Sequence, residues 1–242
     1  MKTIKFEDRA EWESFRKGKI TGSILDDVFS VKEATKEDIT VLLDKSGIEY
    51  KKSSKKEDLM LLVPEELKSE VKAKLTKKLE FYELLAHKVS VPENGEEDPM
   101  ERGSRLEEIA IEAFSKKTNQ PISNELVVWV SDANNSLAYS PDGIISDEAV
   151  VETKCLSSAM HLYIYYEKDI PAKYRKQNLQ AFIVNEKLQT LHFVCYDPRI
   201  PALPLHSIAI NRADIEDEIA TYKYYEMQLM EELNKLAEEL TF

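Results

Sequence analysis

The sequence predicts an α/β fold in which helices flank a central mixed β-sheet, with a small helical module inserted near the N-terminus. Runs of β-branched and apolar residues bounded by turn residues gather between residues 122 and 155 and again between 188 and 210, as strands do. One helical pattern, residues 171–185, separates the two groups. Charged amphipathic stretches precede the first group and follow the last, which is the order expected when helices cover a sheet.

The N-terminal stretch AEWESFRKGKITGSILDDVF, residues 10–29, predicts two short helices separated by a turn at Gly18. Thr21 or Ser23 could cap the second of them, because a hydroxyl at this position accepts a hydrogen bond from a free backbone N–H. We expect these helices to belong to the main domain, which comprises residues 1–30 and 79–242.

Residues 31–78 predict an inserted, lysine-rich module that resembles a helix–extended loop–helix unit. Its first helix begins at the capping-box pair Thr35 and Asp38, and its second repeats this plan at Ser54 and Glu57. The extended segment IEYKK joins the two. Residues 65–88 continue with a long charged and apolar periodic pattern, which predicts a helix.

The remaining elements follow in a simple order. Residues 100–117 predict a core-facing helix, and strands are expected within 122–132, 136–145 and 149–155. After the helix of residues 171–185, strands within 188–197 and 203–210 precede a long helix from about residue 212 to residue 240. The apolar face of the helix at 100–117 comprises Leu106, Ile109, Ala110, Ala113 and Phe114.

The formal net charge of −12 argues against a protein that coats nucleic acid by bulk attraction. Its distribution is uneven, because residues 45–78 contain ten lysines and six acidic residues. Any DNA partner must therefore meet a local basic surface.

Several classes of protein and site are excluded by composition. The sequence has neither a signal-peptide pattern nor an apolar run of membrane-spanning length, so we expect a cytoplasmic protein. Cys155 and Cys195 lie in apolar strand-like runs, which excludes a disulfide framework or a four-cysteine metal site and predicts buried free thiols. The four histidines lack metal-ligand spacing, so we expect no zinc; they are His87, His161, His192 and His206.

The stretch SPDGIISDEAVVETKC, residues 140–155, carries the chemistry. If its two arms pair across the SDE turn, Asp142 and Glu152 approach one another from adjacent strands. Carboxylate oxygens are the ligands that Mg²⁺ prefers, and the carbonyl of Thr153 could add a third. The strand period of two places Lys154 on the face of Glu152, where its ammonium can orient an attacking water. Together these residues suit metal-assisted phosphodiester hydrolysis.

The PD and ExK signatures resemble the PD-(D/E)xK nuclease superfamily, and further motifs resemble its lambda-exonuclease-like, or YqaJ-like, viral recombinase family. The chain has WESFRKGKITGS at residues 12–23, where that family has a tryptophan–arginine–glycine–serine element. RGSRLEEIA supplies the glycine and glutamate of a helix, KYRKQNLQAF the tyrosine and two glutamines, and YDPR ends a later strand.

This resemblance implies a restriction-endonuclease-like core and an alkaline-type exonuclease. Such an enzyme degrades one strand of linear duplex DNA from the 5′ end with Mg²⁺, for which Mn²⁺ is expected to substitute. By analogy it also implies a ring-shaped trimer around the DNA and a single-strand annealing protein as the partner that takes the exposed 3′ strand.

The resemblance extends the set of candidate site residues. Glu107 is expected to add a carboxylate for a second ion or a metal-bound water, and Gln180 to position water or substrate. Arg16 and Ser23 are expected to bind the terminal 5′-phosphate, a role that suits the guanidinium fork of arginine. The remaining DNA-binding candidates are Ser140, which would complete that pocket, and Tyr174 and Gln177, which share a helical face with Gln180.

The lysine-rich module departs from the family pattern and could touch duplex DNA through phosphates, present a solvated face or contact a partner protein. Two other functions stay open. The first is an endonuclease that uses the same Asp142, Glu152 and Lys154 but cuts internally. The second is a non-catalytic DNA-binding recombination protein, against which the intact triad argues.

Overall fold

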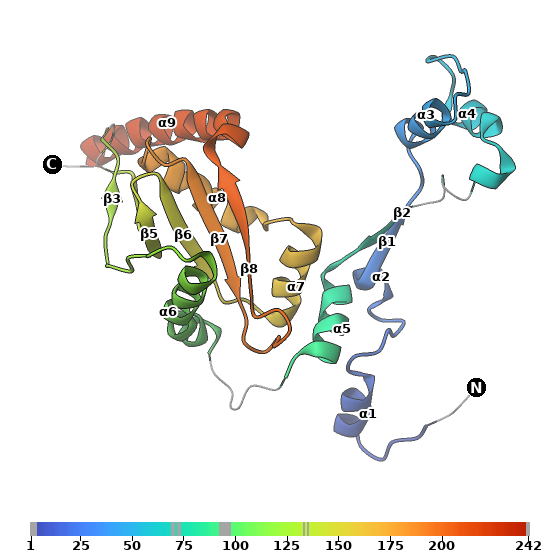
Figure 1. Ribbon diagram of the computed structural model, residues 1–242, viewed down its shortest axis with the longest axis horizontal. Helices are drawn as coiled ribbons and strands as arrows, with labels where there is room; N and C mark the ends of the chain where they lie inside the picture. Colours follow the sequence, from blue (N-terminus) through green and yellow to red (C-terminus); the bar gives the residue numbers. More distant parts are fainter. Residues whose placement is uncertain are drawn as a thin grey trace. The chain divides into compact units, whose positions relative to one another are not determined.

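The computed structural model of the chain describes residues 4–68, 71, 74–91, 98–132, 134 and 136–240 (Figure 1). The chain forms two compact units, residues 1–87 and 88–242. The module of residues 31–78 lies within the first unit, and its separation from a split main domain stays a prediction. In the described part of the chain, no helix combines the length and the apolar character needed to cross a bilayer.

The first unit begins with helices α1 (Arg9–Arg16) and α2 (Leu25–Val28), followed later in the chain by α5 (Leu79–Val89). Gly18 makes the predicted turn with φ of 71°, and a Cβ at this position would lie 2.5 Å from Cδ2 of His87. A larger residue is therefore disfavoured by both conformation and space. The prediction that Thr21 or Ser23 caps α2 is wrong, because the N-cap is Ile24 and no side chain caps the helix.

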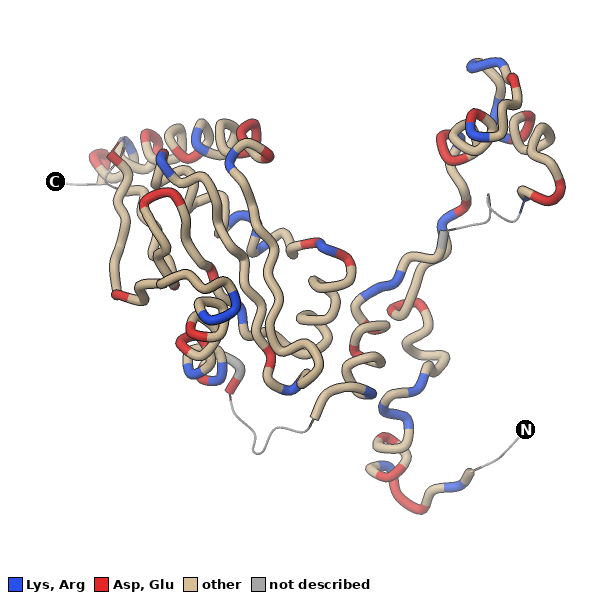
Figure 2. Tube along the Cα trace, in the orientation of Figure 1, with Lys and Arg blue, Asp and Glu red and all other residues tan. Residues whose placement is uncertain are grey.

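The module of the first unit stands on a two-stranded ribbon. Strand β1 (Phe29–Lys32) pairs antiparallel with β2 (Lys74–Lys77), and between them lie α3 (Lys36–Lys45), α4 (Lys56–Leu62) and the 3₁₀ turn η1 (Glu65–Leu67). The helices enclose a small core of their own, and Figure 2 shows lysines gathered on the loop that joins them. The fully or almost fully buried residues of this core are Ile39, Leu43, Leu59 and Val63.

Two of the predicted helix boundaries in this unit need correction. The capping box of Thr35 and Asp38 is confirmed, but the second helix has Lys55 at its N-cap, with no side-chain cap from Ser54. The single helix predicted over residues 65–88 is wrong, because this segment holds η1, β2 and the first part of α5. The chain must return to pair with β1, and this long-range pairing overrides the helical periodicity.

The second unit is built on a four-stranded sheet of order β5-β6-β7-β8 (Figure 1). Strands β5 (Gly143–Ser146) and β6 (Ala149–Lys154) form an antiparallel hairpin, β6 pairs in parallel with β7 (Thr190–Tyr196), and β7 pairs antiparallel with β8 (Leu205–Asn211). The parallel step is bridged by α7 (Ser158–Glu167) and α8 (Ala172–Val184). This mixed sheet flanked by helices confirms the predicted fold class.

Alternation along the central strands gives the sheet two buried faces. Val151 and Val194 pack with Phe114 of α6 (Pro99–Thr118) on one face. Val150 and Phe193 belong to the larger core, to which α8 and the start of α9 (Glu216–Leu240) contribute on the other face. Each fully buried Val, Leu or Phe side chain contributes roughly 1.5–3 kcal/mol to stability. The burial of these side chains therefore holds the central strands in position.

The remaining predicted helices and strands agree with the structure to different degrees. Helix α6 lies where the apolar periodicity predicts it, whereas α7 was not predicted. Where a strand was expected within residues 122–132, the structure has only an isolated bridge between Ser123 and Ile144 and the short strand β3 (Trp129–Val130). Strand β3 pairs with β4 (Ala138–Tyr139). The last helix begins at Glu216, after the 3₁₀ turn η2 (Arg212–Asp214).

A buried ion cluster joins α6 to the end of β7. The fully buried Asp197 carboxylate accepts from Nη2 of Arg102 at 3.0 Å, from Nε of Arg199 at 2.8 Å and from the hydroxyl of Ser158 at 2.6 Å. Hydrogen bonds from Arg199 and Ser158 outweigh burial and hold the pKa of Asp197 below its ordinary value. Arg102 also donates to the carbonyl of Cys155, so the cluster fixes the chain directly after β6.

Two buried histidines pack against each other between α7 and β8. The Nε2 of His161 donates to the carbonyl of Leu203, and the Nε2 of His206 donates to the carbonyl of His161, each at 2.9 Å. The ring centroids are 4.3 Å apart. Burial, followed by the neighbouring His161, lowers the pKa of His206 to about 4, so the ring is neutral at neutral pH.

Acidification from about pH 6.5 to pH 4 is expected to destabilise the protein. An unfolded histidine has a pKa of about 6.5, so the unfolded chain binds this proton before the folded chain does. His206 therefore lowers the free energy of unfolding by up to ~1.4 kcal/mol per pH unit in this window, with no effect above it. Denaturant titrations at several pH values would show this slope, and His206→Gln, which keeps an N–H donor, should flatten it. An unchanged slope in that variant would contradict the assignment.

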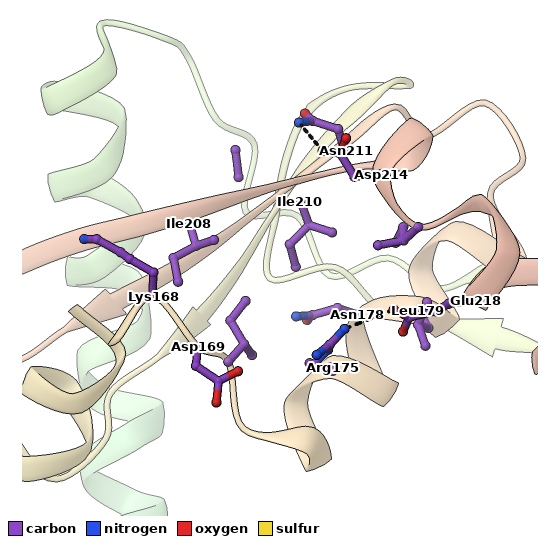
Figure 3. Close-up of a pocket in the computed structure, with 13 residues that line it drawn as sticks. Lys168, Asp169, Arg175, Asn178, Leu179, Ile208, Ile210, Asn211, Asp214 and Glu218 are labelled. Carbon is purple, nitrogen blue, oxygen red and sulfur yellow. Dashed lines mark hydrogen bonds and ion pairs between the residues drawn. The ribbon is translucent and has the colours of Figure 1, made fainter. Parts of the chain in front are cut away.

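A cavity of about 280 Å³ lies between α8, β8 and the start of α9 (Figure 3). Its walls are largely apolar, and the ion pair of Arg175 and Glu218, with an N–O distance of 3.0 Å, lies among its lining residues. Asn178 lies in the middle of these residues and is 1% exposed. In the described part of the chain no group hydrogen-bonds to its amide, so a buried polar group is left without compensation.

Asn178→Leu is expected to raise the free energy of unfolding by about 1–3 kcal/mol, because it removes the desolvation cost of an unpaired amide beside Leu179 and Ile210. Equilibrium denaturation measures the gain. Asn211→Leu serves as the control, because Asn211 is exposed and already donates to Asp214, so its replacement should not stabilise the fold. Destabilisation by Asn178→Leu would show that the amide has a partner.

Candidate active site

The β5–β6 hairpin brings the two predicted carboxylates to one place. Gly143 pairs with Val151 in the antiparallel register, so Asp142, just before β5, lies beside Glu152 and Thr153. The Asp142 Oδ2 accepts from the backbone N–H of Thr153 at 2.6 Å and from its hydroxyl at 3.0 Å. These two bonds fix the orientation of the Asp142 carboxylate.

Glu152 is a completely buried carboxylate with three polar partners. Its Oε2 accepts from the hydroxyl of Tyr139 at 2.5 Å, and its Oε1 accepts from Nζ of Lys154 at 2.5 Å and from Nε2 of Gln177 at 2.6 Å. Burial, followed by the charge of Asp142, raises the pKa of Glu152, although Lys154 acts in the opposite direction.

Lys154 lies on the same strand face as Glu152, as the period of two requires. Its ammonium also donates to the carbonyl of Thr153 at 3.0 Å and lies 5.7 Å from the ring centroid of Tyr174. Burial alone lowers the pKa of Lys154, but the charge and hydrogen bond of Glu152 raise it overall. The lysine is therefore held as a cation against the buried carboxylate.

Helix α6 supplies a third carboxylate. Glu107 and Asp142 both line an open cleft of about 270 Å³, together with Ser140 and Pro141. Burial, followed by the charge of Asp142, raises the pKa of Glu107, and Glu152 adds to this effect. Three acidic groups from α6, the start of β5 and β6 thus lie within electrostatic reach of one another.

The donor set fits a hard divalent cation. Oxygen atoms from Asp142, Glu152 and the Thr153 carbonyl are the ligand type that Mg²⁺ prefers. The ammonium of Lys154 bonds both Glu152 and the Thr153 carbonyl, which shows that a positive charge is favoured between these oxygens. In the described part of the chain, no group of three or more His, Cys, Asp or Glu residues is arranged to hold a metal as it stands. A cation at the Glu152 and Thr153 oxygens would compete with the Lys154 ammonium, which contacts both.

The three candidates on α8 lie in different surroundings. Gln177 donates to Glu152, whereas the amide of Gln180 faces α9. With the Gln180 amide turned so that its nitrogen faces α9, this nitrogen donates to Oε1 of Glu226 at 2.6 Å. Tyr174 packs against Phe193, with ring centroids 5.9 Å apart. The structure thus brings Gln177 to the carboxylates and gives Gln180 a different neighbour, and the proposed role of Gln180 stays a prediction.

Sequence reasoning missed Tyr139, which bonds the buried Glu152 carboxylate. It directly precedes Ser140, and the alternation of a strand would have placed it on the inner face. The hydroxyl of Ser140 donates to the carbonyl of Val127 at 2.7 Å, and the residue remains exposed at the cleft.

Arg16 and Ser23 form a polar group within the first unit. The Nη2 of Arg16 donates to the hydroxyls of Ser23 at 3.0 Å and Thr21 at 3.2 Å. Its guanidinium carbon lies 4.1 Å from the ring centroid of Trp12, so the planar fork stacks on the aromatic ring. A guanidinium and two hydroxyls together can bind a phosphate group.

Solved structures that resemble the chain include two of one enzyme and one of a phage-related protein. The alkaline exonuclease LHK-Exo from Laribacter hongkongensis has 20% identity and a TM-score of 0.47, with 96% of this chain and 100% of that chain covered. The same enzyme in complex with dAMP has 18% identity, the same coverage and a TM-score of 0.47. A phage-related exonuclease from Haemophilus somnus 129PT has 13% identity and a TM-score of 0.35, with 84% and 97% covered.

No curated protein sequence matches the chain. A family model described as the YqaJ-like viral recombinase domain matches residues 11–187, which include Arg16, Asp142, Glu152 and Lys154. Because this match spans well over half of the sequence, the chain belongs to the YqaJ-like viral recombinase family.

Proposed function

We propose that this protein is a Mg²⁺-dependent exonuclease that digests one strand of linear duplex DNA from its 5′ end. Membership of the YqaJ-like viral recombinase family supports a phage-type DNA exonuclease. The observation that carries the finer proposal is the pairing of a buried Glu152 with Lys154, beside Asp142 and Glu107. Acidic ligands next to one well-held ammonium are the components of metal-assisted phosphodiester hydrolysis.

Each side chain has a proposed task. Asp142, Glu152 and the Thr153 carbonyl would hold Mg²⁺, and Mn²⁺ is expected to substitute. When bound, such an ion supplies Lewis acidity and charge neutralisation at the scissile phosphate. Lys154 orients the attacking water and stabilises negative charge on the phosphate oxygens. Glu107 hydrogen-bonds a water in the cleft, and Gln177 keeps the Glu152 carboxylate in place.

We propose that the first unit determines the direction of digestion. The Arg16 guanidinium and the hydroxyls of Ser23 and Thr21 are proposed to bind a terminal 5′-phosphate. A phosphate would replace the hydroxyl groups as the acceptor for the Arg16 fork, and charge-assisted bonds of this kind are stronger than neutral ones. Ser140 and Tyr174 are proposed to contact the DNA backbone nearer the carboxylates.

The assembly is also a proposal. A ring-shaped trimer would reconcile a net charge of −12 with DNA binding, since an acidic exterior can surround a basic channel. The exposed 3′ strand would pass to a single-strand annealing protein. The proposed site of action is the cytoplasm of a bacterial host.

An endonuclease with the same carboxylates is the second candidate. It would cut within a duplex, so a covalently closed circle separates the two functions. We expect Mg²⁺-dependent digestion of linear duplex, faster from a 5′-phosphate than from a 5′-hydroxyl, while the circle remains intact. Arg16→Gln should remove the preference for the phosphate. Cutting of the circle would favour the endonuclease, and DNA binding without any cutting would favour a non-catalytic recombination protein.

A further inference from the structure

The loop between α3 and α4 concentrates positive charge in an otherwise acidic chain. Residues 51–56 read KKSSKK, with four lysines and no acidic residue. Lys51, Lys52 and Lys55 are exposed, and within the described part of the chain their ammonium groups make no hydrogen bond or ion pair. Figure 2 shows this charge at the end of the module farthest from the β1–β2 ribbon. Like charges gathered in this way repel one another, and an anion relieves the repulsion.

The loop is held in shape rather than free. Lys36 of α3 donates to the carbonyl of Lys52 at 2.8 Å, and the backbone N–H of Ser54 donates to the carbonyl of Lys51 at 2.9 Å. The hydroxyl of Tyr50 donates to Asp44 at 3.3 Å. The lysines are therefore presented from a preorganised backbone, which lowers the entropic cost of binding.

Three acidic residues of the same module are engaged away from the loop tip. Asp38 closes the capping box of α3, and Asp44 accepts from Tyr50. Glu33 pairs with Lys56, with an N–O distance of 3.0 Å. These contacts neutralise one lysine of the run and leave Lys51, Lys52 and Lys55 for an external anion.

The chemistry of the loop fits the backbone of duplex DNA. Lysine ammonium groups bind phosphate oxygens as point charges and carry no sequence information. Proteins that bind single strands usually add aromatic platforms for base stacking. Tyr50 is the one aromatic residue in the sequence of residues 33–68, and it packs against the core of the module. A duplex is therefore favoured over a single strand.

We propose that residues 51–56 form an auxiliary binding site for the phosphate backbone of duplex DNA. The inference rests on the proposed function, because it assumes a DNA substrate, and it adds a contact outside the Arg16 group and the carboxylates. A tethered second contact raises the effective concentration of DNA at the enzyme. It should increase affinity for duplexes long enough to reach both sites and lengthen the tract digested per encounter.

The test is the salt dependence of duplex binding by the full chain, measured by fluorescence anisotropy in EDTA so that no cleavage occurs. The triple variant K51S/K52S/K55S is compared with K116S/K187S/K235S, which removes the same charge from exposed lysines of the second unit. We expect the loop variant to bind more weakly and to lower the slope of log affinity against log salt by about 0.9 for each lost phosphate contact. The arginine variant K51R/K52R/K55R should restore both.

Equal weakening by the control triple, or an unchanged slope in the loop variant, would overturn the proposal, and the latter would favour a protein partner. Circular dichroism confirms that each variant is folded. Because binding is measured without cleavage, this test is independent of the test of the proposed enzyme activity. If the protein cut no DNA but the loop variant still lowered the salt dependence of binding, the auxiliary site would stand and the proposed exonuclease activity would not.

Discussion

Lys154→Met should lower the turnover of linear duplex by roughly 10²–10⁴-fold, the range for loss of a group that positions a proton or stabilises transition-state charge. Methionine keeps an apolar stem near Tyr174 but removes the ammonium that contacts Glu152 and the Thr153 carbonyl. Single-turnover digestion at saturating enzyme measures the effect on chemistry apart from binding.

Two controls make this result specific. Lys187→Met removes an exposed lysine of the same unit and should leave turnover unchanged. Lys154→Met also leaves the buried Glu152 without its cation, so folding must be confirmed by thermal denaturation at the assay temperature. Turnover within a factor of two of the unchanged protein, in a folded variant, would remove Lys154 from the proposed mechanism.

Asp197→Ala should lower the free energy of unfolding by about 3–5 kcal/mol, the cost of leaving buried charges without their partner. The carboxylate is fully buried, and Arg102, which bonds it, is itself 7% exposed. The cluster also anchors the carbonyls of Cys155 and Leu156 directly after β6, so the variant should loosen the strand that carries Glu152.

The exposed pair of Arg175 and Glu218 provides a matched comparison. Glu218→Ala removes a carboxylate at the same N–O distance of 3.0 Å, but from a solvated surface, and should cost less than about 1 kcal/mol. Equilibrium denaturation of both variants gives the difference. Similar losses in the two variants would mean that the Asp197 cluster does not stabilise the fold through its burial.

The sequence predicted those parts of the fold that depend on local pattern. The β5–β6 hairpin, α6, α8 and the sheet of β7 and β8 follow from strand alternation, turn residues and helical periodicity. The helix predicted over residues 65–88 failed because pairing of β2 with β1 is a long-range interaction. Helix α7 was not predicted from the sequence. Five of its ten residues are buried, so it lacks the polar face by which a surface helix is recognised.

The same distinction applies to the candidate site. Spacing alone predicted that Lys154 and Glu152 share a face, and the hairpin placed Asp142 beside them. Which α8 glutamine reaches Glu152 depends on the rotation of the helix against the sheet, so the contact of Gln177 could be read only from the structure. Tyr139 comes from a separate short ribbon, whose approach to β6 is likewise a matter of tertiary packing.

We propose that Asp142, Glu152 and Lys154 together catalyse the hydrolysis of DNA from a 5′ end with a divalent metal. The most direct measurement follows a linear duplex labelled at either end of one strand during digestion in Mg²⁺ and in EDTA. We predict immediate release of the 5′ label as nucleotide, late release of the 3′ label, and no release of either in EDTA. Early release of the 3′ label, or digestion that continues in EDTA, would contradict the account.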